Sequence, residues 1–339
     1  MTRLIAILLI GLLTARGYAH ERDLTVVNRD AGITLAGTLS TPTEVAPRGV
    51  IVMITGSGAQ DRDETIMGHR PFKIIADSLS AHGWAAIRMD DRGTGKSAGQ
   101  FDGAKQSDFM SDIAAAIAVA DSLYGQLPLG LLGHSEGGQI AYRLAATTPC
   151  VDFIVTLAAP AWEGDSIIMS QTRALAVGQT GRWDGEPVQR QLLEIVKSRM
   201  PATYARIALK ETLSQELGEM ARLPEVQQQL AAQIDILLSP WYREFIRYNP
   251  AEDIGAVTVP WLALNGSKDT QVLPDNLATI KSLNPGVETV ELPGLNHLFQ
   301  QCSTGLVTEY ATSGPVLASN TIDLIINFLD SILSKHTSK

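Results

Sequence analysis

A serine between small residues, where an apolar run gives way to a helical pattern, is the feature that most constrains this fold. Gly133-His134-Ser135-Glu136-Gly137 follows the apolar run 129–132 and precedes a helical pattern. A serine in this G-x-S-x-G form occupies a sharp strand-to-helix turn, with its hydroxyl exposed above a sheet. The backbone doubles back there, so glycines 133 and 137 leave room that a Cβ would fill. An ordinary glycine turn is the alternative, but the flanking patterns favour the serine turn.

Strand patterns alternate with helical patterns along most of the chain. Strands are predicted at 24–28, 33–40, 50–55, 84–89, 129–132, 153–157, 261–265 and 287–292. Helices are predicted near 71–81, 107–123, 136–147, 274–282 and 319–334. The first two strands are expected to pair antiparallel. The alternation after them predicts an α/β fold, a doubly wound and mostly parallel sheet with helices on both faces.

A serine nucleophile needs a base, and the chain offers histidines at 20, 69, 82, 134, 297 and 336. His297 is the best candidate, because it follows the strand pattern 287–292 in a loop of turn-forming residues. His69, in the loop after an early strand, is its rival. A satisfied surface histidine is the alternative for His297. His134 is the neighbour of Ser135, and the turn is expected to point the two side chains apart.

A base that gains and then loses a proton needs an acid to hold its tautomer. The segment 260–265 has the pattern of a buried strand, and Asp269 lies in the loop after it. Aspartates in turns commonly bond their own backbone, so Asp269 alone would be a structural residue. The chain order Ser135, Asp269, His297 is nucleophile, acid, base. That is the order of the α/β-hydrolase fold and differs from that of the two main protease families.

On these residues the chain resembles the α/β-hydrolase superfamily, and within it the secreted bacterial esterase-like and serine-aminopeptidase-like hydrolases. Four motifs carry the resemblance: residues 55–64, residues 91–97, the serine turn, and the loops of Asp269 and His297. They extend over nearly all of the chain after residue 19. The resemblance implies a catalytic domain made of residues 20–160 and 251–339.

Acyl transfer builds negative charge on the carbonyl oxygen and needs N–H donors held ready at that place. The backbone N–H of Glu136, directly after the nucleophile, is one expected donor. The superfamily usually has His-Gly in the loop that gives the second donor, and this chain has Thr55-Gly56. By position after that pair, the N–H of Ser57 is favoured and that of Gly58 is the alternative.

Three stretches in or near these loops need separate interpretation. The charged run 60–64 is predicted to be solvated and mutually paired. Gly95-Lys96-Ser97 ends like a P-loop, but Asp90 stands where the first glycine is required. Gly56-Ser57-Gly58 lacks the third glycine of the dinucleotide fingerprint, because Asp61 stands there. No nucleotide site is predicted.

Residues 161–250 separate two strands and show no strand pattern. Apolar residues recur there at helical spacing: Leu192, Leu193, Ile195 and Val196; Leu209, Leu213 and Leu217; Leu230, Ile234 and Leu237. The segment is predicted to be a helical cap inserted above the site. Trp241, Tyr242 and Phe245 near its end are candidate substrate-pocket residues, although core packing is the favoured role of most of the cap's aromatic side chains.

The composition suits one folded enzyme of moderate size. Hydrophobic residues make up 45% and charged residues 19% of the 339 residues, enough to bury a large core. The formal net charge of −9 disfavours nucleic acid as a partner.

The beginning of the chain has the features of a secretory signal. A cationic start at Arg3, the apolar stretch 4–13 and Gly17-Tyr18-Ala19 predict a signal peptide over residues 1–19, cleaved before His20. Export to the periplasm or the medium follows, and a retained membrane anchor is the alternative. Removal of Arg3 and Arg16 would leave a net charge of −11.

The two cysteines are predicted to stay free. Cys150 should precede a strand at the amino edge of the sheet, and Cys302 should follow the His297 loop at the carboxyl edge. A strand of five or six residues spans about 17 to 20 Å, which exceeds the Cα separation that a disulfide tolerates. Two buried thiols are expected.

The predicted reaction is hydrolysis of carboxylic esters with a small or medium acyl group through an acyl-enzyme, with no metal or organic cofactor. A capped serine aminopeptidase, a lactone or thioester hydrolase, and a binding protein without activity are the alternatives. An aminopeptidase would hold the substrate amine with a cap carboxylate. The candidates for that role are Glu163, Asp165, Glu211, Glu216 and Glu244.

Overall fold

One mixed sheet organises the molecule, which we describe from a computed structural model over residues 19–313 and 317–336. Its strands lie in the order β1-β2-β4-β3-β5-β6-β7-β8. The strand bounds are β1 His20–Asn28, β2 Ile33–Thr41, β3 Val50–Ile54, β4 Ala85–Met89, β5 Leu129–His134, β6 Phe153–Leu157, β7 Trp261–Gly266 and β8 Glu288–Leu292. β1 pairs antiparallel with β2 and β2 with β4, and the other neighbours pair parallel. The predicted α/β fold with a mostly parallel sheet is confirmed.

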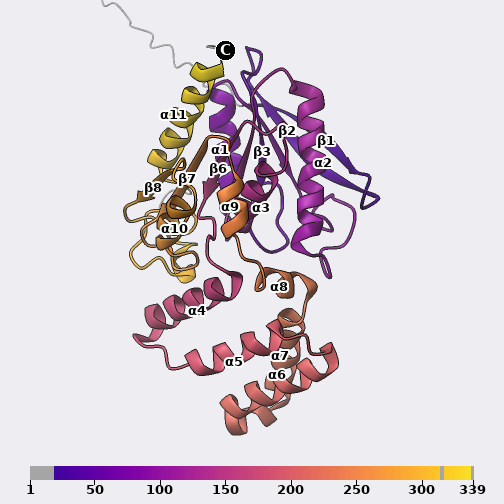
Figure 1. The fold of residues 1–339 in the computed structure, drawn as a ribbon, viewed down its shortest axis with the longest axis vertical. Helices are drawn as coiled ribbons and strands as arrows, with labels where there is room; N and C mark the ends of the chain where they lie inside the picture. Colours follow the sequence, from indigo (N-terminus) through magenta and orange to yellow (C-terminus); the bar gives the residue numbers. More distant parts are fainter. Residues whose placement is uncertain (1–18, 314–316, 337–339) are drawn as a thin grey trace, which may run out of the picture.

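Helices cover both faces of this sheet (Figure 1). Their bounds are α1 Pro71–Ala81, α2 Gln106–Tyr124, α3 Glu136–Ala145, α9 Ala251–Ala256, α10 Asp275–Leu283 and α11 Ser319–His336. Helices α2, α3, α9 and α10 contribute to the apolar core on one face, and α1 and α11 to the core on the other. Every residue of β3 through β7 is buried. Parallel strands covered on both faces have this continuous burial, which explains their mostly apolar sequences.

A helical region is inserted between β6 and β7 and lies to one side of the sheet, at the bottom of Figure 1. Its helices are α4 Gly164–Thr180, α5 Glu186–Lys197, α6 Ala202–Leu217, η1 Gly218–Arg222, α7 Pro224–Leu237 and α8 Pro240–Phe245. They share an apolar cluster that includes Ile167, Leu193, Leu209 and Ile234. This arrangement is consistent with the expected cap. Helix α9 follows it but packs against α3 and α10 beside the sheet.

The strand order places the reactive loops at one edge. From β3 the chain moves to β4 in one direction, and then returns to β5 on the other side of β3. Open α/β sheets bind ligands outside the carboxyl ends of their strands at such a reversal. Ser135 follows β5 directly, Asp269 follows β7, and His297 follows β8.

Further sequence expectations concern the cysteines and the beginning of the chain. Cys150 and Cys302 are free as predicted, but both are only partly buried, because each lies in a loop near the protein surface. The proposed signal peptide lies outside the described residues except for Ala19, and β1 begins at His20. No helix within 19–313 or 317–336 is both long and apolar enough to cross a membrane.

Candidate active site

Ser135 lies on the sharp turn that the sequence predicts. Its φ of +52° and ψ of −121° are unusual for a residue with a side chain, and α3 begins at the next residue. The Ser135 N–H donates to the Leu157 carbonyl at 2.8 Å. A Cβ at position 133 would lie 2.1 Å from the Gly137 oxygen, and one at position 137 would lie 2.1 Å from the Ile54 oxygen. Only glycine fits at both places, so the turn depends on them.

Asp269 and His297 form a buried acid–imidazole pair. The His297 Nδ1 lies 2.7 Å from the Asp269 Oδ2. The other carboxylate oxygen accepts hydrogen bonds from the backbone N–H groups of Gln271 and Val272, at 2.8 and 2.9 Å. The Asp269 carboxylate is therefore fixed on both sides. Asp269 thus binds the backbone of its own turn and the His297 imidazole at the same time. From the sequence alone, these two roles are alternatives.

The loop of His297 is held against β7 by close packing. Gly266 ends β7, and a Cβ on it would lie 2.2 Å from the Leu295 carbonyl oxygen. The side-chain oxygen of Asn296 accepts from the N–H groups of Leu298 and Gln300, both at 3.0 Å. These contacts hold the loop of His297 in a conformation that brings His297 close to Asp269.

A small cavity of about 70 Å³ adjoins Ser135. Its other lining residues come from the loops after β3 and β6, from α3, from the cap and from the Asp269 loop: Ser57, Glu136, Pro160, Ile167, Ile168, Gln171, Trp241, Phe245, Gln271 and Val272. The structure thus places Ser57 and Glu136, the favoured oxyanion donors, beside Ser135. Within the described residues, neither the Ser135 hydroxyl nor the His297 Nε2 has a hydrogen-bond partner. Catalytic hydrogen bonds commonly tighten only when substrate binds.

The N–H groups at the proposed oxyanion position differ in what they contact. The Gly56 N–H donates to the Glu64 carboxylate at 2.7 Å. Among described residues, the Ser57 and Gly58 N–H groups have no acceptor. Glu136 is the first residue of α3, where backbone N–H groups lack partners inside the helix. A Cβ on Gly56 would lie 3.2 Å from the Ser135 Cβ, so this loop runs directly past the serine.

The prediction of a solvated charge run at residues 60–64 is wrong. Asp63 is 5% exposed and Glu64 is 1% exposed. Asp63 forms ion pairs with Arg70 and with Arg88 of β4. Arg88 is itself buried, so its charge requires carboxylate partners. This end of the charged run is buried because Asp63 pairs with an arginine on a buried strand.

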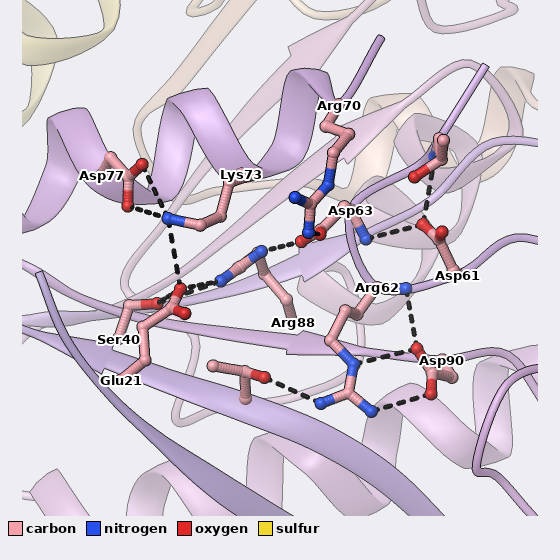
Figure 2. Close-up of polar contacts among 12 residues, drawn as sticks. Glu21, Ser40, Asp61, Arg62, Asp63, Arg70, Lys73, Asp77, Arg88 and Asp90 are labelled. Atoms are coloured by element: carbon pink, nitrogen blue, oxygen red, sulfur yellow. Dashed lines mark hydrogen bonds and ion pairs between the residues drawn. The ribbon is translucent and has the colours of Figure 1, made fainter. Parts of the chain in front are cut away.

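Figure 2 shows the ion network around these residues. Arg88 also contacts Glu21 of β1 at 2.5 Å, and Arg62 forms a two-pronged pair with Asp90 at 2.9 and 2.7 Å. Burial acts to raise the pKa of Asp90, but the hydrogen bonds from Arg62 outweigh it and lower that pKa. The network attaches the loop after β3 to β1 and β4.

His134 contacts the loop of His297, which the sequence analysis did not predict. Its Nε2 lies 2.9 Å from the His297 carbonyl oxygen and its Nδ1 lies 2.8 Å from the Glu64 carboxylate. The ring centroids of His134 and His297 are 4.7 Å apart. The loop after β8 packs over the end of β5, where the His297 backbone and ring meet the His134 ring.

The Glu136 carboxylate is buried beside the cavity. Its Oε1 accepts from the Trp241 Nε1 at 2.6 Å and from the Gln106 Nε2 at 3.1 Å. Burial raises the pKa of Glu136 to about 7, and these neutral donors only partly oppose that shift. The contact with Trp241 connects the serine turn to the cap.

The three aromatic pocket candidates divide into two groups. Trp241 and Phe245 line the cavity and stack on each other, with ring centroids 5.4 Å apart. Tyr242 and Phe245 are both buried in the apolar cluster of the cap, but Tyr242 does not line the cavity. Helix α8 turns successive side chains in different directions, so neighbours 241 and 242 face different surroundings.

Other candidates lie apart from the serine. The His69 Nε2 lies 2.8 Å from the Tyr310 carbonyl oxygen, and His69 does not line the Ser135 cavity. None of the five acidic cap candidates lines the Ser135 cavity: Glu163, Asp165, Glu211, Glu216 and Glu244. Within residues 19–313 and 317–336, no group of three acidic, histidine or cysteine side chains is arranged to hold a metal ion.

Comparisons with known proteins identify the family and the fold of the chain. Residues 68–298 match the family described as serine aminopeptidase, S33. The chain is 23% identical over 285 residues to esterase EstD of Thermotoga maritima, covering 82% of this chain and 60% of the length of EstD. It is 25% identical over 286 residues to a monoacylglycerol lipase of Mycolicibacterium smegmatis, covering 83% and 92% of the two chains. An esterase structure from Pyrococcus furiosus has the same fold, with a TM-score of 0.57, 14% identity and coverage of 93% and 92%.

Proposed function

The chain belongs to the serine aminopeptidase S33 family of α/β hydrolases, and from that premise we propose that it hydrolyses carboxylic esters with Ser135 as nucleophile. The observation that carries the proposal is the buried Asp269–His297 hydrogen bond at 2.7 Å, at the strand edge that carries Ser135. Similarity to an esterase and to a lipase supports an ester substrate.

The proposed mechanism is a two-step acyl transfer. His297 takes the proton of the Ser135 hydroxyl as its oxygen attacks the ester carbonyl, and Asp269 stabilises the imidazolium that results. The N–H groups of Glu136 and Ser57 hold the oxyanion. His297 returns the proton to the departing alcohol, and water then attacks the acyl-enzyme by the same route.

The lining of the cavity favours an ester with a short acyl group over a peptide. Its volume is about 70 Å³, and Trp241, Phe245 and Ile167 give it apolar walls. An aminopeptidase needs an ionised carboxylate for the substrate amine. Among the described lining residues, the carboxylates are limited to Glu136, which already accepts from Trp241 and Gln106. The name of the family keeps an aminopeptidase as the second candidate.

A panel of substrates tests the assignment. We expect the protein to hydrolyse p-nitrophenyl esters, with rates that fall as the acyl chain lengthens, and to leave aminoacyl p-nitroanilides intact. Ser135→Ala should lower kcat by at least about a thousandfold, because the members of a triad act as a unit. Initial rates of p-nitrophenol and p-nitroaniline release measure both.

A matched serine variant controls for general damage. Ser78 lies on α1, and its hydroxyl donates to the Ile74 carbonyl of the same helix at 2.9 Å, so Ser78→Ala should retain the wild-type rate. Ester hydrolysis by Ser135→Ala at the wild-type rate would contradict the assignment of Ser135 as the nucleophile. Anilide cleavage as efficient as ester cleavage would contradict the esterase assignment and favour a peptidase.

A further inference from the structure

A second carboxylate–imidazole pair, Glu64–His134, lies beside the proposed catalytic pair, and its geometry indicates a structural function. Glu64 Oε1 accepts from the Gly56 N–H at 2.7 Å and from the His134 Nδ1 at 2.8 Å. The His134 Nε2 then reaches the His297 carbonyl oxygen at 2.9 Å. Two side chains thus connect the loop after β3 with the loop of His297. We call them the Glu64–His134 bridge.

The charge on this bridge follows from its hydrogen bonds. Both acceptors of His134 are oxygens, and only an imidazolium can donate from both ring nitrogens. Burial acts to lower the pKa of His134, but the Glu64 carboxylate outweighs it and raises that pKa. An imidazolium paired with a carboxylate gives shorter and stronger hydrogen bonds than neutral partners would.

Glu64 of the bridge has an unfavourable backbone conformation and a buried oxygen without a partner, and each of these features costs free energy. Glu64 has a φ of +52°, which disfavours a residue with a side chain. Its Oε2 is buried without a hydrogen-bond partner among the described residues. Buried polar atoms normally find partners, so a departure like this one calls for an explanation. Holding two loops together is such an explanation.

The ion network of Figure 2 fixes the Glu64 end of the bridge. The neighbouring Asp63 pairs with buried Arg88 of β4, and the Asp63 carbonyl accepts from the Phe72 N–H of α1 at 3.2 Å. The Glu64 N–H donates to the Asp61 carbonyl at 2.9 Å. Glu64 is therefore attached to the sheet, and the two loops are positioned relative to it.

We propose that Glu64 and His134 are positioning residues for ester hydrolysis. They set the distance between the oxyanion N–H of Ser57, which follows Gly56, and the imidazole of His297. Neither side chain touches the reacting atoms. This inference rests on the proposed function, because it assumes that Ser135 is acylated and that His297 is its base.

Kinetics of Glu64→Gln and His134→Asn test the bridge. Glu64→Gln removes the charge while keeping an oxygen for Gly56, and His134→Asn removes the donor to the His297 carbonyl. We expect each to lower kcat for a p-nitrophenyl ester by about 10²-fold, since small misplacements of reacting groups have effects of this size. KM should change little, because the loss is confined to the transition state.

The double variant separates a bridge from two independent effects. Residues that act through one shared contact are not additive, so Glu64→Gln/His134→Asn should have a kcat close to that of the slower single variant. Losses that multiply in the double variant would contradict the bridge. A wild-type kcat in both single variants would contradict it as well.

Asp112→Asn is the matched control for a change in a buried carboxylate. Asp112 on α2 is 4% exposed and accepts from Arg92 Nε and Asn28 Nδ2, both at 2.7 Å, and neither of these donors belongs to the Gly56 loop or to the loop of His297. It should lower the urea midpoint of unfolding and leave kcat unchanged. Equal losses of kcat in Asp112→Asn and Glu64→Gln would reduce Glu64 to a structural role. Wild-type turnover that persists in Ser135→Ala would instead contradict the proposed function.

Discussion

Two carboxylate–imidazole pairs lie in ring contact at the strand edge that carries Ser135, and they differ in the contact that the second imidazole nitrogen makes. The pairs Asp269–His297 and Glu64–His134 have nearly equal O–N distances of 2.7 and 2.8 Å, and no member is more than 4% exposed. The His134 Nε2 lies against a backbone carbonyl. Among described residues, the His297 Nε2 has no hydrogen-bond partner.

This difference shows that a carboxylate partner alone does not make a histidine a base. A general base needs a free nitrogen that can accept a proton from the nucleophile. His134 uses both nitrogens in structural contacts, and the pair it forms with Glu64 holds loops in place. His297 keeps one nitrogen available, so the same chemical pair is suited to proton transfer.

The largest expected effect comes from changing the carboxylate of the proposed catalytic pair, Asp269–His297. Asp269→Asn should lower kcat at neutral pH by about 10⁴-fold, because the amide no longer holds the imidazole in the correct tautomer. Glu64→Gln, the same chemical change in the other pair, should have an effect about a hundred times smaller. Steady-state kinetics on one ester compares them. Equal losses would erase the distinction between the pairs.

A smaller effect concerns Glu136, a buried carboxylate whose partners are neutral donors and not an imidazole. The pKa of Glu136 is raised by burial from 4.5 to about 7, so the folded state binds this proton more tightly than the unfolded state. The free energy of unfolding therefore falls as the pH rises from about 4.5 to about 7, by up to about 3 kcal/mol.

Urea unfolding at pH 5 and at pH 8 measures this contribution of Glu136. Glu136→Gln keeps the shape but cannot ionise, so it should lose less stability between the two pH values than the wild type. The Gln variant should be the relatively more stable of the two at pH 8. Parallel changes in both proteins would show that the carboxyl does not titrate as the structure indicates.

The sheet could be predicted from the sequence because its physical signals are local. Buried parallel strands are short apolar runs, and β3, β5 and β6 begin at the residues expected. Asp269 and His297 could be named because strand ends of one sheet converge at one edge. The turn at Ser135 could be predicted because the glycines that it requires, 133 and 137, are its sequence neighbours.

The bridge could not be predicted because its contacts are not local. Glu64 lies in a run of charged residues that has the composition of a solvated surface, and its partner His134 is 70 residues away. Trp241 meets Glu136 across 105 residues. The one available signal was Arg88, a charge inside a strand pattern that had to find buried carboxylates. Helical spacing in the cap predicted helices but not which aromatic side chains would reach the cavity.

Covalent labelling tests the central claim, that Ser135 is the nucleophile activated by His297, most directly. A fluorophosphonate reacts with an activated serine hydroxyl, and mass spectrometry of the digested protein locates the adduct. We predict one adduct, on Ser135, that is absent from Ser135→Ala and forms much more slowly in His297→Ala than in His134→Asn. An adduct on another residue, or labelling of Ser135 at the wild-type rate without His297, would contradict the account.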